Sequence, residues 1–254
     1  MDKLPKPTLA DVYAITIGSA DLDKSFEFYS KLGFTEVIRS DWPFQLILIS
    51  DGSFLILLRK SDETFISLTY YVKELDKIVA LMEDYGMEFI FRPAEDDMIK
   101  RYVMRSPDGL NISLVSFVDG FVQPPGPTML RMQQQDYFNP GKYVNKVCGM
   151  FGEFAHPVSD LEASISFWEK LGFRAVSKFT TPYPWAIITD GLAVVGLHQA
   201  THFNYPVITF FASDMAEKIE RLRAYGFEMK EAGKGNVVLN TPEKQHINLF
   251  RMGF

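Results

Sequence analysis

Few side chains in this sequence can carry chemistry, and most of them lie in its second half. Glu153 is the one charged residue in the otherwise uncharged stretch 148–155. His198 ends an apolar stretch, and His246 lies two residues before Asn248. A carboxylate can act as a general base, and together with imidazoles it can hold zinc or manganese. We therefore consider Glu153 and His198 as catalytic residues, and His246 and Asn248 as binding residues.

Each of these residues also has a structural interpretation. Most carboxylates are exposed, so Glu153 could face solvent or pair with a lysine. His198 and His246 could be strand-end histidines that are exposed or bonded to backbone, and no motif spacing supports a metal. We interpret His202 as a loop residue and His156 as structural. No Ser-His-Asp order, phosphate-binding glycine loop or nucleotide fingerprint appears.

Aromatic residues next to proline occur at corresponding places in the two halves, in Trp42-Pro43-Phe44-Gln45 and Pro182-Tyr183-Pro184-Trp185. If these residues line a pocket, they indicate a ligand with a flat or apolar part. The alternative is that they pack in the protein interior as large apolar residues usually do. Arg59 could line the same pocket or begin a charged loop. The first half offers these polar side chains for a pocket without a metal: Gln45, Arg59, Ser67, Asn111 and Ser113.

The positions of these residues follow from an internal duplication. Asp21–Phe34 matches Asp160–Phe173, which lies 139 residues later, and the same offset carries Asp51-Gly52 onto Asp190-Gly191. Each half is itself double, at an offset of 53 or 54 residues. The chain is therefore predicted to hold four similar units of about fifty residues.

Every unit shows the pattern βαβββ. A short apolar strand precedes an acidic residue whose side chain can accept hydrogen bonds from the free N–H groups of a helix start. The helix carries an apolar stripe at spacings of three and four, as in Leu22, Phe26 and Tyr29. A glycine follows, and then strands separated by turn signals. We predict an α+β fold whose units form a concave pocket for a small molecule.

The segment between the halves is too apolar for a free linker and too rich in proline and glycine for regular structure. It contains Pro124-Pro125-Gly126-Pro127 beside apolar residues such as Met129 and Tyr137. We interpret it as an ordered connector packed along both halves. The predicted domains are residues 9–117 and 149–254, with the connector at 118–148.

Composition narrows the classes of partner. The 254 residues are 47% hydrophobic and 23% charged, with a net charge of -6 and a pI of about 5.3. An acidic chain without a basic stripe argues against nucleic acid. The sequence contains no run of about 18 apolar residues, so we expect no helix that spans a membrane. The first ten residues lack the apolar core of a signal peptide. With Cys148 as the single cysteine, we expect a cytoplasmic protein.

The motif DL-x-x-S-x-x-F-[YW]-x-x-LGF, together with Ser106-Pro107-Asp108-Gly109 before a last strand, resembles the vicinal oxygen chelate superfamily. That superfamily includes glyoxalase I, extradiol dioxygenases and bleomycin-resistance proteins. The resemblance implies two glyoxalase-like domains, each with a curved mixed sheet around a pocket. It specifies a fold and leaves the function open, because the superfamily hosts many activities.

The resemblance also assigns metal-ligand positions on the first and last strands of the units. Metal enzymes carry His, Gln or Glu there, but only Glu153 is a strong ligand in this chain. His198 and His246 share a strand face with two of these positions, so a shifted metal site that includes Glu153 stays open. We otherwise expect no metal and no cofactor. The eight positions are Ala14, Leu57, Ser67 and Ser113 in the first half, and Glu153, Gly196, Val207 and Asn248 in the second.

Three functions stay open. One is metal-independent binding of a small molecule with an apolar or aromatic part, as in bleomycin-resistance proteins. The second is a lyase or isomerase that uses Glu153 as base, with or without a metal near His198 and His246. The third is a structural or regulatory module whose pockets are filled by side chains. We expect the principal pocket in the second half, with Glu153 at its floor and Trp185 beside it, in a monomer or homodimer.

Overall fold

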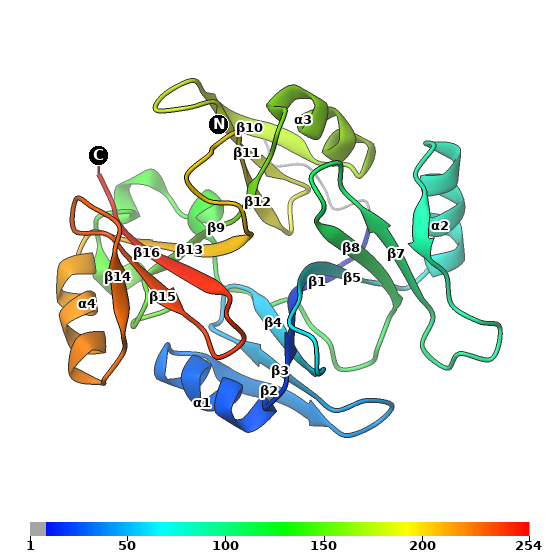
Figure 1. Cartoon of the computed structure of the whole chain (residues 1–254), viewed down its shortest axis with the longest axis horizontal. Helices are drawn as coiled ribbons and strands as arrows, with labels where there is room; N and C mark the ends of the chain where they lie inside the picture. The colour runs from blue at the N-terminus through cyan, green and yellow to red at the C-terminus, as the bar shows by residue number, and fades with distance from the viewer. Residues whose placement is uncertain (1–8, 254) are drawn as a thin grey trace. The chain divides into compact units, whose positions relative to one another are not determined.

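The computed structural model describes residues 9–253 (Figure 1). Most of the segment considered above for a signal peptide, residues 1–8, lies outside this range. Across residues 9–253 no helix is long and apolar enough to cross a membrane. Within the described residues, each half of the sequence contains eight strands and two α-helices, with Ala14 and Glu153 in the first strand of their halves. The predicted duplicated α+β fold is therefore confirmed.

The two halves have the same order of elements. The first half comprises β1 (Val12–Ser19), α1 (Leu22–Lys31), β2 (Thr35–Ser40), β3 (Leu46–Ser50), β4 (Leu55–Lys60), β5 (Ile66–Val72), α2 (Leu75–Asp84), β6 (Phe89–Phe91), β7 (Arg101–Arg105) and β8 (Asn111–Ser116). The second half comprises β9 (Met150–Pro157), α3 (Leu161–Lys170), β10 (Arg174–Phe179), β11 (Trp185–Thr189), β12 (Val194–His198), β13 (Val207–Ala212), α4 (Met215–Ala224), β14 (Met229–Glu231), β15 (Val237–Asn240) and β16 (His246–Arg251).

Each half forms one mixed sheet, and the two sheets correspond strand by strand. Their orders are β2-β3-β4-β1-β5-β8-β7-β6 and β10-β11-β12-β9-β13-β16-β15-β14. The pairs β5–β8 and β13–β16 are parallel, while hairpin pairs such as β2–β3 and β10–β11 are antiparallel. Every residue of β1 and all but the last residue of β9 are buried, as expected for central strands covered on both faces.

The helices begin and end largely as predicted. Asp21 and Asp160 each accept a hydrogen bond at 3.0 Å from the backbone N–H three residues ahead. Glu74 and Asp214 make no such bond, so the prediction was wrong there; their carboxylates pair with lysines of their own helices instead. α1 packs on β2, β3 and β4 (Figure 1), and α3 packs on β10, β11 and β12.

The chain divides into two compact units, and each contains segments of both sequence halves. One unit comprises the described residues up to 15 with 66–123 and 155–205, and the other comprises 16–65, 124–154 and 206–253. The domain boundaries proposed from the sequence stay a prediction.

The second compact unit has an aromatic core drawn from both sequence halves. Phe54 stacks on Phe151 with ring centroids 4.1 Å apart, and Phe34 meets Phe54 edge to face at 5.6 Å. Phe210 lies within 6.5 Å of all three rings. Offset stacks and edge contacts of this kind add to the stabilisation from apolar burial.

The connector is ordered, and its residues 124–148 belong to this second compact unit. It forms short 3₁₀ turns at Met129–Arg131, Gln134–Asp136 and Pro140–Lys142. The hydroxyl oxygen of the buried Tyr143 lies 2.8 Å from the Ser213 hydroxyl and accepts a hydrogen bond from the Ser213 N–H at 2.9 Å.

The connector reaches the first half through Asn145, which is 2% exposed. Its Nδ2 donates to the Leu32 carbonyl at 3.0 Å and to the Asp51 carboxylate at 3.4 Å. Its Oδ1 accepts from the N–H groups of Val147 and Cys148 at 2.9 and 2.8 Å. One carboxamide therefore satisfies backbone groups on two segments that are far apart in sequence.

We predict that Asn145→Ala lowers the free energy of unfolding by about 3 kcal/mol, because it leaves several buried polar groups without partners. The matched control is Asn139→Ala in the same connector. Asn139 is exposed and accepts one local hydrogen bond, from the Gly141 N–H, so its loss should cost about 1 kcal/mol or less. Urea unfolding of both variants measures the difference; equal costs would contradict the role given to Asn145.

Candidate functional site

The eight positions that the resemblance assigns to metal ligands all lie in the four central strands of each sheet, namely β1, β4, β5 and β8 or their counterparts β9, β12, β13 and β16. In the first half they hold methyl, isobutyl and hydroxyl side chains, which do not fit a divalent metal. In the second half the carboxylate of Glu153 is the one strong ligand. Among residues 9–253, no three His, Cys, Asp or Glu side chains form a group that could hold a metal ion.

Glu153 lies inside β9 and is 6% exposed. Its neighbours Gly152 and Phe154 are buried as well, so the alternative of a solvent-facing carboxylate does not apply. Burying a carboxylate carries a large desolvation cost unless the group is hydrogen-bonded or paired. The counterpart in β1 is Ala14, which avoids that cost. The second half therefore buries a carboxylate at a position where the first half has a methyl group.

His198 is the last residue of β12 and belongs to a stack of three rings. Its imidazole is parallel to the Trp185 indole, with an angle of 3° and centroids 5.4 Å apart. Trp185 in turn stacks on Phe179 at 4.1 Å. These residues are cross-strand partners, Phe179 with Trp185 and Trp185 with His198. The stack thus crosses β10, β11 and β12 on one face of the sheet.

Two loops complete the surroundings of this imidazole. The Tyr183 hydroxyl oxygen lies 3.3 Å from Nδ1 of His198, and Phe203 meets the imidazole edge to face at 5.7 Å. His202 lies in the loop after β12, as predicted, and packs on Tyr183 and Phe203. Since protein rings cover both faces of Trp185, a ligand can reach its edge but cannot stack on it. Phe179, which is 43% exposed, offers its outer face.

His246 and Asn248 lie two residues apart on β16, so both side chains point to the same side of the sheet. They pair with Val207 and Thr209 of β13. Nδ2 of Asn248 donates to the Thr209 hydroxyl at 3.3 Å. Burial, and to a smaller extent the charge of Lys230, lowers the pKa of His246. Both side chains are half-buried.

The polar residues predicted for the first half occupy two kinds of place. Ser67 on β5 and Ser113 on β8 are each 5% exposed. Arg59 lies in β4 instead of beginning a loop, and its guanidinium stands 4.4 Å from the centre of the Phe44 ring. Gln45 is exposed and donates to Asp41 at 3.3 Å. Arg59 occupies the position that His198 has in the second half.

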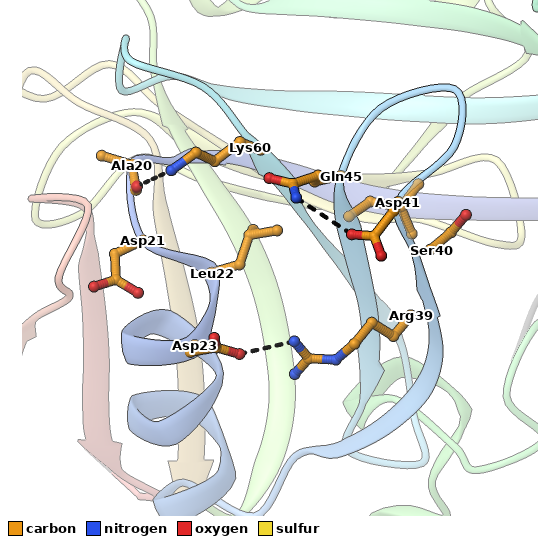
Figure 2. A pocket seen from close by; sticks show the side chains of 10 residues that line it. Ala20, Asp21, Leu22, Asp23, Arg39, Ser40, Asp41, Gln45 and Lys60 are labelled. Atoms are coloured by element: carbon orange, nitrogen blue, oxygen red, sulfur yellow. Dashed lines mark hydrogen bonds and ion pairs between the residues drawn. The ribbon is translucent and has the colours of Figure 1, made fainter.

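A groove of about 360 Å³ lies beside Gln45, between the start of α1 and the ends of β2, β3 and β4 (Figure 2). Arg39 closes one side through an ion pair with Asp23 at 2.7 Å, and the Lys60 amino group donates to the Ala20 carbonyl. Sequence reasoning missed this groove, since no motif marks it. Ser40 and Leu46 line it, and the offset of 139 would have shown that the second half carries Phe179 and Trp185 at these positions.

His156 lies in β9 and is 2% exposed. Its Nε2 is 3.4 Å from the Ser106 hydroxyl, and its Nδ1 is buried without a hydrogen-bond partner among the described residues. Burial lowers the pKa of His156 to about 4; Asp108 opposes this shift, and His198 adds to it. His156 is therefore held neutral.

Comparison with solved structures finds proteins of similar fold, whereas comparison of sequences finds no match. No protein-family model matches the sequence, and no curated protein matches it. Homoprotocatechuate 2,3-dioxygenase from Arthrobacter globiformis has a TM-score of 0.63 at 17% identity, over 99% of this chain and 82% of the other. The 2,3-dioxygenase LapB from Pseudomonas sp. KL28 gives 0.61 at 15% identity, over 98% and 94% of the two chains. The homoprotocatechuate 2,3-dioxygenase of Brevibacterium fuscum gives 0.60 at 15%, over 99% and 74%.

The chain therefore has the same fold as these 2,3-dioxygenases, which confirms the fold that the sequence resemblance implied. At these identities the likeness does not extend to the reaction.

The environment of His156 predicts a pH dependence of stability. An unfolded histidine has a pKa near 6.5, so the folded state loses stability as the pH falls from about 6.5 towards 4. We expect His156→Gln to remove about 2–3 kcal/mol of that loss. Urea unfolding at a series of pH values measures it. His202→Gln, at an exposed imidazole, is the control and should keep the wild-type slope; a wild-type slope for His156→Gln would contradict the assignment.

Proposed function

We propose that this chain binds a small molecule with a flat or apolar part, without a metal at the superfamily's usual positions. The observation that carries the proposal is the chemistry of the eight ligand positions, where a single carboxylate stands among apolar, hydroxyl and amide side chains. A fold that keeps its strands but replaces its ligands suits binding better than metal-dependent turnover.

We assign the binding role to the second half. This assignment is supported by two pairs of corresponding positions at which the halves differ. Glu153 corresponds to Ala14 of the first half, and His198 corresponds to Arg59. His246, Asn248 and Trp185 are the further candidates there. In the first half, Gln45, Arg59, Ser67 and Ser113 are candidates for a second polar pocket. A cytoplasmic location and the lack of a nucleic-acid partner stay predictions.

A lyase or isomerase reaction with Glu153 as base is the second candidate. It is favoured by the burial of this carboxylate in a strand with no other charged side chain. A base of this kind would remove a proton next to a carbonyl group, and the protonated Glu153, once it has exchanged with solvent, would return a proton to carbon and become a carboxylate again. Incorporation of solvent deuterium into a bound ligand would distinguish turnover from binding alone.

The first test of the proposal is elemental analysis of the purified protein. We expect less than stoichiometric zinc, iron, manganese and nickel, and no rise of melting temperature with any of these ions, because the ligand set is incomplete. A stoichiometric metal that is lost in Glu153→Gln and Asn248→Ala would show that the metal site survives and would overturn the metal-free part of the proposal.

The second test compares one substitution in each half. Glu153→Gln keeps the shape of the side chain and removes its charge, so we expect binding of an aromatic acid or phenol, found by a thermal-shift screen, to change about tenfold or more. The free energy of unfolding should change less than binding does. Ser113→Ala, at a buried ligand position of the first half, should leave binding within about twofold. Equal effects of the two substitutions on binding would refute the assignment to the second half.

A further inference from the structure

The free end of the first sheet is formed by β6, which is unusually apolar for an edge strand. β6 is the last strand in the sheet order, so β7 is its single strand neighbour among residues 9–253. Its three residues are Phe89, Ile90 and Phe91, and Ile90 and Phe91 are 54% and 42% exposed. Exposed apolar edges are templates for pairing with another chain, and proteins usually protect them.

The second sheet ends on β14, which shows such protection. This counterpart of β6 has the sequence Met229-Lys230-Glu231 and places charged side chains where β6 has Ile90 and Phe91. Lysine on an edge strand is a common device against edge-to-edge pairing. The fold therefore does not require an apolar edge: β14 carries charged side chains there, whereas β6 keeps apolar ones and is limited only by its length of three residues and its bulge.

The backbone of β6 is also only partly engaged with β7. Phe89 pairs with Met104 and Phe91 pairs with Val103, so Ile90 is the extra residue of a bulge. Arg92 and Arg101 stand over the faces of the two rings, with guanidinium carbons 5.2 and 4.7 Å from the ring centres. These cations lie over ring faces, and Arg92 also forms an ion pair with Glu83 of α2 at 2.7 Å, so Glu88 of a second copy would be an additional partner for its guanidinium.

The sequence around β6 is complementary to itself in the antiparallel direction. It reads Glu88-Phe89-Ile90-Phe91-Arg92. If two copies pair antiparallel about Ile90, Phe89 of one copy faces Phe91 of the other, and Glu88 faces Arg92 of the second copy. The twofold axis creates two such charge pairs, because an isologous interface repeats each contact. The same pairing at β14 would place Lys230 against Lys230, which is unfavourable.

We propose that two copies of this chain associate through their β6 edges, as antiparallel neighbours centred on Ile90. We infer that the partner is a second copy of this chain, because antiparallel pairing brings Glu88 of each copy opposite Arg92 of the other. The paired surface is small compared with the roughly 1,200 Å² that a stable interface buries. The dimer is therefore weak and forms in a concentration-dependent manner.

A charge exchange tests the proposal. Sedimentation velocity over a wide range of protein concentration should show a reversible monomer–dimer equilibrium for the wild type. Glu88→Arg alone and Arg92→Glu alone each place like charges opposite each other twice, and each should raise the dimer dissociation constant about tenfold or more. The double variant restores opposite charges and should return the constant to within about threefold of the wild type.

Ile90→Lys, which imitates the β14 edge, should abolish the dimer. Glu228→Arg, at the position next to β14 that corresponds to Glu88, is the matched control and should leave the dissociation constant unchanged. Circular dichroism and thermal unfolding confirm that each variant is folded. A wild type that stays monomeric at every concentration would overturn the proposal, as would a dimer on which the single and double charge variants have the same effect.

Discussion

The rest of the structure depends on the burial of the central strands β1 and β9. Because these strands are covered on both faces, each of their side chains must be apolar or find a polar partner inside the protein. β1 meets this constraint at two key positions with Ala14 and Ile17. β9 carries Glu153 and His156 at the corresponding positions. The constraint is the same in both halves, and His156, whose Nδ1 is buried without a hydrogen-bond partner among the described residues, carries a desolvation cost that Ile17 avoids.

The same contrast continues towards the sheet edge. Ser40, Leu46 and Arg59 are aligned across β2, β3 and β4. Their counterparts in the second half are Phe179, Trp185 and His198, whose rings form the continuous stack described above. Ser40 and Leu46 line a charged groove in one half, and large rings occupy the corresponding positions in the other. One backbone therefore supports two different surfaces, as expected when function resides in side chains placed on a shared fold.

The turns between the strands are duplicated more faithfully than the surfaces. Asp51 and Asp190 each accept hydrogen bonds from backbone N–H groups two and three residues ahead. Both are almost fully buried, and this desolvation raises their pKa values against the lowering effect of those hydrogen bonds. The connector adds the carboxamide of Asn145 to Asp51. These buried carboxylates hold the turns that set where β4 and β12 begin, so their role is structural.

The resemblance to a known superfamily supplied the eight ligand positions, and the sequence by itself determined the duplication and the order of elements. These features depend on local patterns, such as the apolar spacing of Leu22, Phe26 and Tyr29 and the glycine after each helix, which hold in any context. Two of the four helix caps could not be predicted from the sequence, because the carboxylates of Glu74 and Asp214 choose between a backbone N–H and a nearby lysine.

Only the tertiary structure decided which side chains meet. The burial of Glu153, the coverage of both faces of Trp185 and the groove beside Gln45 depend on contacts across strands that no local pattern records. The grouping of segments from both halves into compact units also lies beyond local patterns, because it depends on the burial of rings such as Phe54 and Phe151 against each other. Long-range packing, with its large number of weak contacts, is the physical reason for this limit.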